Sequence, residues 1–400
     1  MKHAPQPAFL KLLEYCQAED WAGYDPYDAL NSAFLKVIPL PRLPRIALTQ
    51  FLRRSPANLR RLLLIPKTQN PKAIGLFLSA LATLPELSNL REEQAGQLVD
   101  HLTERLMALR SPGSPYWCWG YSFPWQTRTL LVPAGAPNLV ATVFAAGALL
   151  DVYERRQDKQ TLSVALSAAE YLLNELYWTE GAVASFSYPS PAFRSRTHNA
   201  NFLASALLCR VARYTGEARF LAPALEAARY SASRQNRDGS WYYGEAQSQR
   251  WIDNFHTGYN LCALQSVSRD ACTDEFDSAM DRGLEFYRSH FFRADGAPRY
   301  FHNRTYPIDI HCVAQSIITL LAFGNRESTQ LARSVFDWVM DHMWDERGFF
   351  YYRVLRSCTI RASYMRWSQA WMLLAISRLL AAQASARAGG HPEAVEARFA

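Results

Sequence analysis

Residues 201–217, NFLASALLCRVARYTGE, and residues 219–235, RFLAPALEAARYSASRQ, form a pair of helical patterns that decides the fold class. The first pattern is apolar on nearly every side, which indicates a helix that is buried all round. The second repeats apolar residues at i, i+3, i+4 and i+7 and is charged on its opposite face. The pair therefore predicts an inner helix that is covered by an outer one.

Similar pairs recur along the chain. The inner patterns begin near residues 72, 137, 197, 254, 308 and 363, so the period is roughly 55 to 65 residues. Six such pairs predict an all-α (α/α)6 toroid, with an open solenoid as the alternative. No clear sixth outer pattern follows the last inner one, and residues 27–38, YDALNSAFLKVI, are a candidate to close the ring.

The same helical patterns divide the chain into three parts. Residues 1–70 form a helical N-terminal extension with a basic segment, residues 71–385 form the toroid, and residues 386–400 form a frayed tail. Short aromatic segments such as DGSWYYGE at residues 238–245 follow the outer helices, and their turn signals and alternation predict short β-turns. We expect these turns to gather at one end of the toroid, beside the starts of the inner helices.

Polar residues occupy the expected starts of the inner helices. With a spacing of 55 residues they form two columns, Asn199, Asn254 and Asp309 in one, and Asn201, His256, His311 and Arg366 in the other. Helix capping explains the first column, because Asn and Asp are favoured caps. His and Arg are poor first-turn residues, since their charge faces the positive end of the helix dipole. The second column therefore favours a shared polar site.

Candidate catalytic residues are the proton-transferring side chains near these starts: Asp253, His256, Asp309 and His311. Two carboxylates can act as acid and base on a sugar, and histidine moves protons near neutral pH. Candidate substrate-binding residues are Tyr188, His198, Asn199, Asn201, Trp241, Tyr243, Glu245, Arg250, Trp251, Asn254, Arg366 and Trp367. Aromatic rings stack on sugars, and arginine binds carboxylate or phosphate. No HxH or HExxH spacing is present, so we expect no metal and no cofactor.

A basic segment precedes the first inner helix. Eight basic residues and no acidic residue lie between residues 42 and 72: Arg42, Arg45, Arg53, Arg54, Arg60, Arg61, Lys67 and Lys72. This pattern is typical of a solvated basic face, or of a face that meets an anionic surface or a protein partner. No nucleic-acid motif accompanies it, so we expect no nucleic-acid partner.

Bulk properties favour a globular intracellular protein. The chain is 49% hydrophobic and 20% charged, with a net charge of +7. Its seven cysteines are scattered without a CxxC pair, as in a reduced cytosolic protein. No signal-peptide pattern and no apolar run long enough to span a bilayer is present. We therefore expect a cytoplasmic location, with a peripheral position at the inner membrane if the basic segment docks there.

Residues 234–245, RQNRDGSWYYGE, resemble the Q-x-x-D-G-x-W turn of terpenoid-cyclase and prenyltransferase repeats, which are α/α toroids. The resemblance covers one repeat, and the DxDD acid of squalene–hopene-type cyclases is absent. Together with HNANFLASALLCRVARYTGE, RWIDNFHTGYN and YPIDIHCVAQ, the segment more closely resembles a bacterial α/α-toroid family associated with surface-polysaccharide biosynthesis. More distant resemblances are to sugar 2-epimerases, six-hairpin glycosidases, polysaccharide lyases and uronyl C5-epimerases.

These resemblances imply a toroid in a carbohydrate setting. Combined with the candidate residues, they lead us to expect a carbohydrate-active enzyme that works by hydrolysis, β-elimination or epimerisation on an acidic glycan. A terpenoid-cyclase-like or prenyl-binding enzyme and a non-catalytic glycan-binding scaffold are the alternatives, because a fold does not determine a function.

Overall fold

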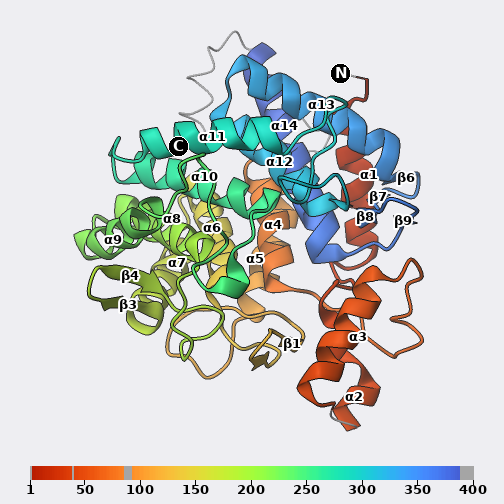
Figure 1. Ribbon diagram of the computed structural model, residues 1–400, viewed down its shortest axis with the longest axis horizontal. Coiled ribbons are helices and arrows are strands. Elements are labelled where there is room, and N and C mark those ends of the chain that lie inside the picture. The colour runs from red at the N-terminus through yellow and green to blue at the C-terminus, as the bar shows by residue number, and fades with distance from the viewer. Residues whose placement is uncertain (1, 38–39, 85–91, 388–400) are drawn as a thin grey trace.

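The structure is a computed structural model that describes residues 2–37, 40–84 and 92–387. Its centre is a ring of inner helices: α4 (Pro71–Ala82), α6 (Leu139–Arg156), α8 (His198–Thr215), α10 (Asn254–Asp270), α12 (Ile310–Phe323) and α14 (Ala370–Arg387). Each inner helix contacts the next one in this order, and α14 contacts α4 (Figure 1). The ring is therefore closed, which confirms the predicted (α/α)6 toroid and excludes an open solenoid.

An outer ring covers the inner one. The helices α5 (Glu92–Ala108), α7 (Lys159–Tyr171), α9 (Leu221–Ala232), α11 (Asp277–His290) and α13 (Arg326–Met343) each pack on the inner helix that precedes them. The sixth outer position belongs to α1 (Pro5–Ala18), which packs on α14. The toroid thus begins with a helix that the predicted boundary assigns to the extension.

The prediction that residues 27–38 close the ring is wrong. In its described part this segment forms the short 3-10 turn η1 (Asp28–Asn31) and α2 (Ala33–Val37), and neither packs as an outer helix. The reason is the apolar pattern of α1. Its buried residues Phe9, Leu12, Leu13 and Cys16 follow the i, i+3, i+4, i+7 spacing of a helix with one covered face, and α2 is too short for such a stripe.

The rest of the N-terminal extension forms a small lobe beside the ring (Figure 1). The lobe contains η1, α2 and α3 (Arg42–Arg54), and its core consists of Ala29, Leu52 and Ile65. Arg60 is buried and donates hydrogen bonds to Asp28 Oδ1 and to the Tyr364 hydroxyl, both at 2.7 Å. This side chain of the basic segment therefore fastens the lobe to the ring.

Short strands gather around the helix starts. The hairpins pair β1 (Trp125–Gln126) with β2 (Leu131–Val132), β3 (Tyr177–Glu180) with β4 (Val183–Phe186), and β6 (Trp344–Asp345) with β7 (Phe349–Phe350). A fourth group is a three-stranded sheet of β5 (Ile308–Asp309), β8 (Arg353–Val354) and β9 (Thr359–Ile360). The segment 238–245 forms no such strand; it makes one isolated β-bridge, between Thr197 and Gly244, and backbone hydrogen bonds to residues 196, 198, 249 and 251. Its turn requires Gly239, which has φ +89° and would place a Cβ atom 2.2 Å from the Arg282 carbonyl.

The C-terminal tail is only partly covered by the structure. The predicted frayed tail lies outside the described residues, apart from residues 386 and 387, which end α14. Among the described helices, none is both long and apolar enough to cross a bilayer.

Candidate active site

A cavity of about 1440 Å³ lies at the end of the toroid where the inner helices begin. The second residue after the N-cap of every inner helix lines it: Lys72, Val140, Asn199, Phe255, His311 and Arg366. The last of these belongs to the π-turn η5 (Met365–Gln369), which continues into α14. Six helix N-termini therefore surround one space, and their free N–H groups and dipoles make it attractive to anions.

This register differs from the 55-residue columns. The N-cap positions of α8, α10 and α12 are Thr197, Asp253 and Asp309, which are 56 residues apart. Asn254 therefore follows the cap of its helix, whereas Asp309 is itself the cap. His256 lies one position later in its helix than His311 does. The predicted columns mix neighbouring helical positions, and a shift of one residue turns a helical side chain by about 100°.

Ten of the predicted site residues line the cavity: Tyr188, Asn199, Tyr243, Arg250, Trp251, Asp253, His256, His311, Arg366 and Trp367. They come from α8, α10, α12, η5 and the loops that precede these helices. The structure thus brings His256, His311 and Arg366 together from three repeats.

Three other predicted residues are held by hydrogen bonds away from the cavity near the outer helix α9. Asn201 accepts from Ser185 Oγ and donates to Ser231 Oγ, both at 2.9 Å. The side chains of His198 and Trp241 also bond to Ser231, through its hydroxyl and its carbonyl. Asn201 therefore does not join the shared site that its column predicts, because its amide is satisfied on the outer side.

The remaining three predicted residues also lie off the cavity. Asn254 is buried between Tyr287 and Ser316, to which it is hydrogen-bonded. Glu245 binds Tyr230, Arg196 and Arg234 near the outer surface: the Tyr230 hydroxyl donates to Glu245 Oε1 at 2.5 Å, and Arg196 and Arg234 form ion pairs with the carboxylate.

Asp309, the third of these residues, is fully buried below the cavity floor. It accepts hydrogen bonds from Arg353 Nε at 2.8 Å, from Trp367 Nε1 at 2.9 Å and from the backbone N–H of His311 at 3.0 Å. With its oxygens used in this way, the carboxylate is suited to positioning His311, Trp367 and Arg353 rather than to reaching a substrate.

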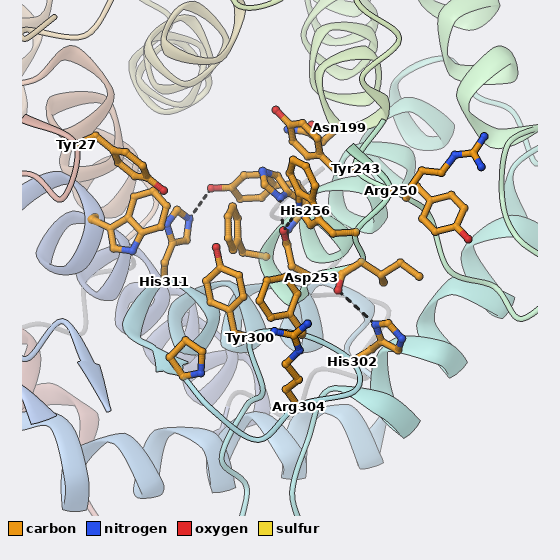
Figure 2. A pocket seen from close by; sticks show the side chains of 18 of the residues that line it. Tyr27, Asn199, Tyr243, Arg250, Asp253, His256, Tyr300, His302, Arg304 and His311 are labelled. Carbon is orange, nitrogen blue, oxygen red and sulfur yellow. Dashed lines mark hydrogen bonds and ion pairs between the residues drawn. The ribbon is translucent and has the colours of Figure 1, made fainter. Parts of the chain in front are cut away.

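Asp253 and His256 form a dyad at the start of α10 (Figure 2). Asp253 Oδ1 caps the helix by accepting from the His256 backbone N–H, and its Oδ2 lies 2.7 Å from His256 Nδ1. Trp251 Nε1 donates to the same Oδ2 at 2.8 Å. In the neutral imidazole this geometry places the proton on Nδ1 and the lone pair on Nε2. Because the His256 side chain is 19% exposed and lines the cavity, that lone pair is available to a ligand.

A second group of proton-carrying side chains lies beside the dyad. The Tyr259 hydroxyl lies 2.6 Å from His311 Nε2, and Lys72 Nζ lies 3.5 Å from the same hydroxyl. Burial raises the pKa of Tyr259 well above its ordinary value and, with the nearby Lys72 and Arg366 charges, lowers the pKa of His311 well below its own. Tyr259 therefore keeps its proton and His311 stays neutral. The rings of His256 and Tyr259 are 6.0 Å apart, so both groups can serve one ligand.

The cavity wall is strongly cationic. Nine of its described lining residues are basic: Arg53, Arg54, Lys72, Arg128, Arg237, Arg250, Arg304, Arg353 and Arg366. Only two are acidic, Asp238 and Asp253. Of the nine, Arg353 and Arg366 form described ion pairs, with Asp309 and Asp25. The other seven have no carboxylate partner among the described ion pairs, which suits the cavity to an anionic ligand.

Aromatic rings supply flat surfaces next to the dyad. Tyr243 and Trp251 stack with their centroids 4.5 Å apart and an interplanar angle of 11°, and Tyr243 is also 4.5 Å from His256. Phe255 stacks on His311 with centroids 4.6 Å apart. Such surfaces bind the apolar faces of sugar rings.

Sequence reasoning missed several cavity residues. Lys72 and Tyr259 could have been found from the helix register, because Lys72 is two residues after the cap Asn70 and Tyr259 is one turn after Phe255. The contribution of the extension had no comparable signal. Four residues of the lobe line the cavity: Tyr27, Gln50, Arg53 and Arg54. Among the described residues, no cluster of three or more His, Cys, Asp or Glu could hold a metal ion.

The buried His198 should make the fold less stable in acid. Burial lowers the pKa of His198 to about 4, from an ordinary value of 6.5. Between these values the unfolded chain binds more protons than the folded one, so the free energy of unfolding falls as the pH drops through this window. The loss should be on the order of 3 kcal/mol. Chemical denaturation of the wild type and of His198→Gln across this pH range measures the loss. The free energy of unfolding should fall less in the variant, and equal losses would refute the role of His198.

No protein-family model matches the chain, and no curated protein is similar to it in sequence. Solved structures, in contrast, share its fold. Cellobiose 2-epimerase from Bacillus thermoamylovorans B4167 has a TM-score of 0.60 and 12% identity, over 78% of this chain and 89% of that chain. An unsaturated glucuronyl hydrolase specific for heparin has a TM-score of 0.58 and 13% identity, over 79% and 87%. A polysaccharide lyase has a TM-score of 0.61 and 11% identity, over 95% and 98%. At this identity the similarities establish the toroid fold alone.

Proposed function

We propose that this protein is a carbohydrate-active enzyme that moves protons on an acidic glycan, in the setting of bacterial polysaccharide metabolism. The observation that carries the proposal is the Asp253–His256 dyad, whose free imidazole nitrogen lines a cavity with nine basic residues. A general base needs an orienting partner and access to its substrate, and the dyad has both. The polysaccharide setting rests on the sequence resemblance.

The charge of the cavity supports an anionic substrate. A uronate or similarly charged sugar would replace water around arginine side chains that have no carboxylate partner among the described residues, and Arg–carboxylate pairs are strong and directional. Polyene cyclisation, in contrast, passes through carbocations, which the eight arginine side chains of the cavity wall would destabilise. A terpenoid-cyclase-like activity is therefore not supported.

The chemistry that fits these groups is proton removal from the carbon next to a sugar carboxylate. His256 Nε2 takes that proton, and Asp253 stabilises the imidazolium that forms. An arginine such as Arg53 or Arg250 holds the substrate carboxylate and stabilises the charge that develops on it. Tyr259 gives its proton to the departing glycosidic oxygen, and elimination follows. If Tyr259 instead gives its proton to that carbon on its other face, the glycosidic bond stays intact and the product is the epimer.

Hydrolysis by two carboxylates has less support. It needs an acid and a base that flank the bond, and the described cavity wall contains only Asp238 and Asp253. Asp253 is bound to His256 and Trp251, and Asp238 is bound to Ser240 in its own turn. The solved structures that share the fold include an epimerase and a polysaccharide lyase, so the toroid is compatible with either outcome.

Product masses test the proposal. The protein is incubated with matched pools of acidic and neutral oligosaccharides, and the products are weighed by mass spectrometry. Elimination gives two products whose masses add up to the substrate mass, hydrolysis adds one water, and epimerisation leaves the mass unchanged but alters chromatographic retention. We expect either elimination or epimerisation, and with acidic sugars only. Turnover of neutral sugars alone would overturn the proposal.

Arg53 should matter for acidic ligands in particular. Its guanidinium donates to the Tyr352 hydroxyl at 3.1 Å and lines the cavity. Arg53→Gln should weaken binding of an acidic oligosaccharide about tenfold or more, because a hydrogen bond to a charged group is lost. Binding of its neutral analogue should change little. Calorimetric titration measures both. Arg293→Gln is the matched control, because Arg293 pairs with Asp295 and does not line the cavity; an equal effect of both changes would refute the role.

A further inference from the structure

The N-terminal lobe exposes an unusual amount of apolar surface. Six large apolar side chains are between 53% and 81% exposed, and we call them the lobe face: Phe34, Val37, Leu43, Phe51, Leu62 and Leu64. The other exposed large hydrophobic residues of the described chain are Leu131, Phe193, Tyr242 and Tyr306, none of them above 41%. Exposed apolar side chains concentrated in one small segment mark an interaction site.

The lobe face belongs to three segments that share one small core. The backbone N–H of Ala33 donates to the Leu64 carbonyl, and Ser32 Oγ donates to the Leu63 carbonyl, which joins α2 to residues 62–65. Leu52 of α3 packs in the same core as Ile65. The three segments therefore form one unit whose inner side chains are buried and whose outer side chains are apolar and exposed.

Helix α3 has three distinct faces. Leu48 and Leu52 pack on the lobe core, and Gln50 and Arg53 line the cavity. Leu43, Ala47 and Phe51 follow the i, i+4, i+8 spacing and are exposed. An exposed apolar stripe on a helix that is already anchored through another face marks an interaction site.

Positive charge surrounds the lobe face. Residues 29–85 contain no Asp or Glu. Arg42, Arg54 and Arg61 are exposed in the same lobe. Apolar side chains combined with arginine and without acidic residues are the composition of surfaces that enter the boundary between lipid headgroups and acyl chains.

We infer that the lobe face docks the protein on an anionic phospholipid bilayer. Phe34, Leu43, Phe51 and their neighbours enter the headgroup region, and Arg42 and Arg61, which do not line the cavity, bind lipid phosphates. Because α3 also supplies part of the cavity wall, docking holds that wall next to the membrane, where membrane-attached acidic glycans are presented. The inference does not depend on the proposed reaction.

Vesicle flotation tests the inference with the full chain. The probes are vesicles of phosphatidylcholine alone and vesicles of phosphatidylcholine mixed with phosphatidylglycerol. We expect the wild type to float with the anionic vesicles, to stay behind with the neutral ones, and to dissociate as salt is raised. Phe51→Asp should lower the vesicle-bound fraction at least tenfold, and Arg61→Gln about fivefold.

Phe193→Asp is the matched control, because Phe193 is exposed but lies outside the lobe, and it should float like the wild type. Melting curves verify that each variant folds, and Leu62→Asp replaces Phe51→Asp if the latter does not. The inference is overturned if the wild type does not float with anionic vesicles. It is also overturned if Phe51→Asp and Leu62→Asp both float as well as the wild type does. A dimer in light scattering that Leu62→Asp dissociates, without vesicle binding, would also overturn it and assign the face to a second copy of the chain.

Discussion

Replacing His256 with alanine should lower turnover of an acidic glycan by about 10²- to 10⁴-fold and leave the melting temperature nearly unchanged. The rate falls because the base that accepts the substrate proton is gone, whereas Asp253 still caps α10 through the backbone N–H of residue 256. The stability cost is small because the imidazole is 19% exposed and because Asp253 keeps its hydrogen bonds from Trp251 Nε1 and from the backbone N–H of residue 256. Initial rates and thermal melting of the same preparations measure the two effects.

His302→Ala is the matched control for this prediction. His302 also lines the cavity, but its ring lies 3.4 Å from the Ile252 carbonyl and pairs with no carboxylate among the described ion pairs (Figure 2). Its loss should lower the rate by no more than a few-fold. If His256→Ala keeps most of its activity, or if both variants lose it equally, the dyad is not the base. The scaffold alternative would then regain support.

Asp309→Ala should be the most destabilising single change in the site, lowering the free energy of unfolding by about 3 to 5 kcal/mol. The side chain is fully buried and pairs with Arg353, which is itself 6% exposed. Removing the carboxylate leaves a buried guanidinium without its counter-charge and takes away the acceptor of Trp367 Nε1. Chemical denaturation measures the loss.

Asp158→Ala is the control that distinguishes the loss of a buried ion pair from the loss of a helix cap. Asp158 caps α7 by accepting from the Gln160 backbone N–H, and it has no described ion pair. Its removal should cost about 1 kcal/mol. If Asp309→Ala costs no more than this and yet abolishes turnover, Asp309 acts on the substrate and the positioning role assigned to it is wrong.

The toroid could be predicted from the sequence because it depends on a repeated local pattern. Apolar inner stripes such as residues 201–217 and covered outer stripes such as residues 219–235 each carry their own period. The same rule applies to Phe9, Leu12, Leu13 and Cys16, so spacing alone predicts α1 as a helix with one covered face. Periodicity, however, does not state which repeat closes the ring, because closure is a contact between the two ends of the chain.

The site was less accessible to sequence reasoning. Helix starts must be known to a single residue before Asn254, which follows a cap, can be distinguished from Asp309, which is a cap. The cap Thr197 makes no side-chain hydrogen bond to its helix, so its residue type does not mark the start of α8. The partners that hold Asn201 and Asp309 away from a ligand, Ser231 and Arg353, come from other elements of the fold. The approach of Arg53 to the cavity depends on how the lobe packs beside the ring, which no local pattern encodes.

The most direct test of the central claim is the fate of carbon-bound hydrogen in the reaction. The protein and its His256→Ala variant are incubated with the acidic glycan in D2O and, separately, in H2 18O, and the sugars are examined by mass spectrometry and NMR. Proton transfer at carbon predicts either a carbon–deuterium bond in the epimer or an unsaturated product without 18O, formed by the wild type and not by the variant. A saturated product that carries 18O and no carbon-bound deuterium would contradict the account.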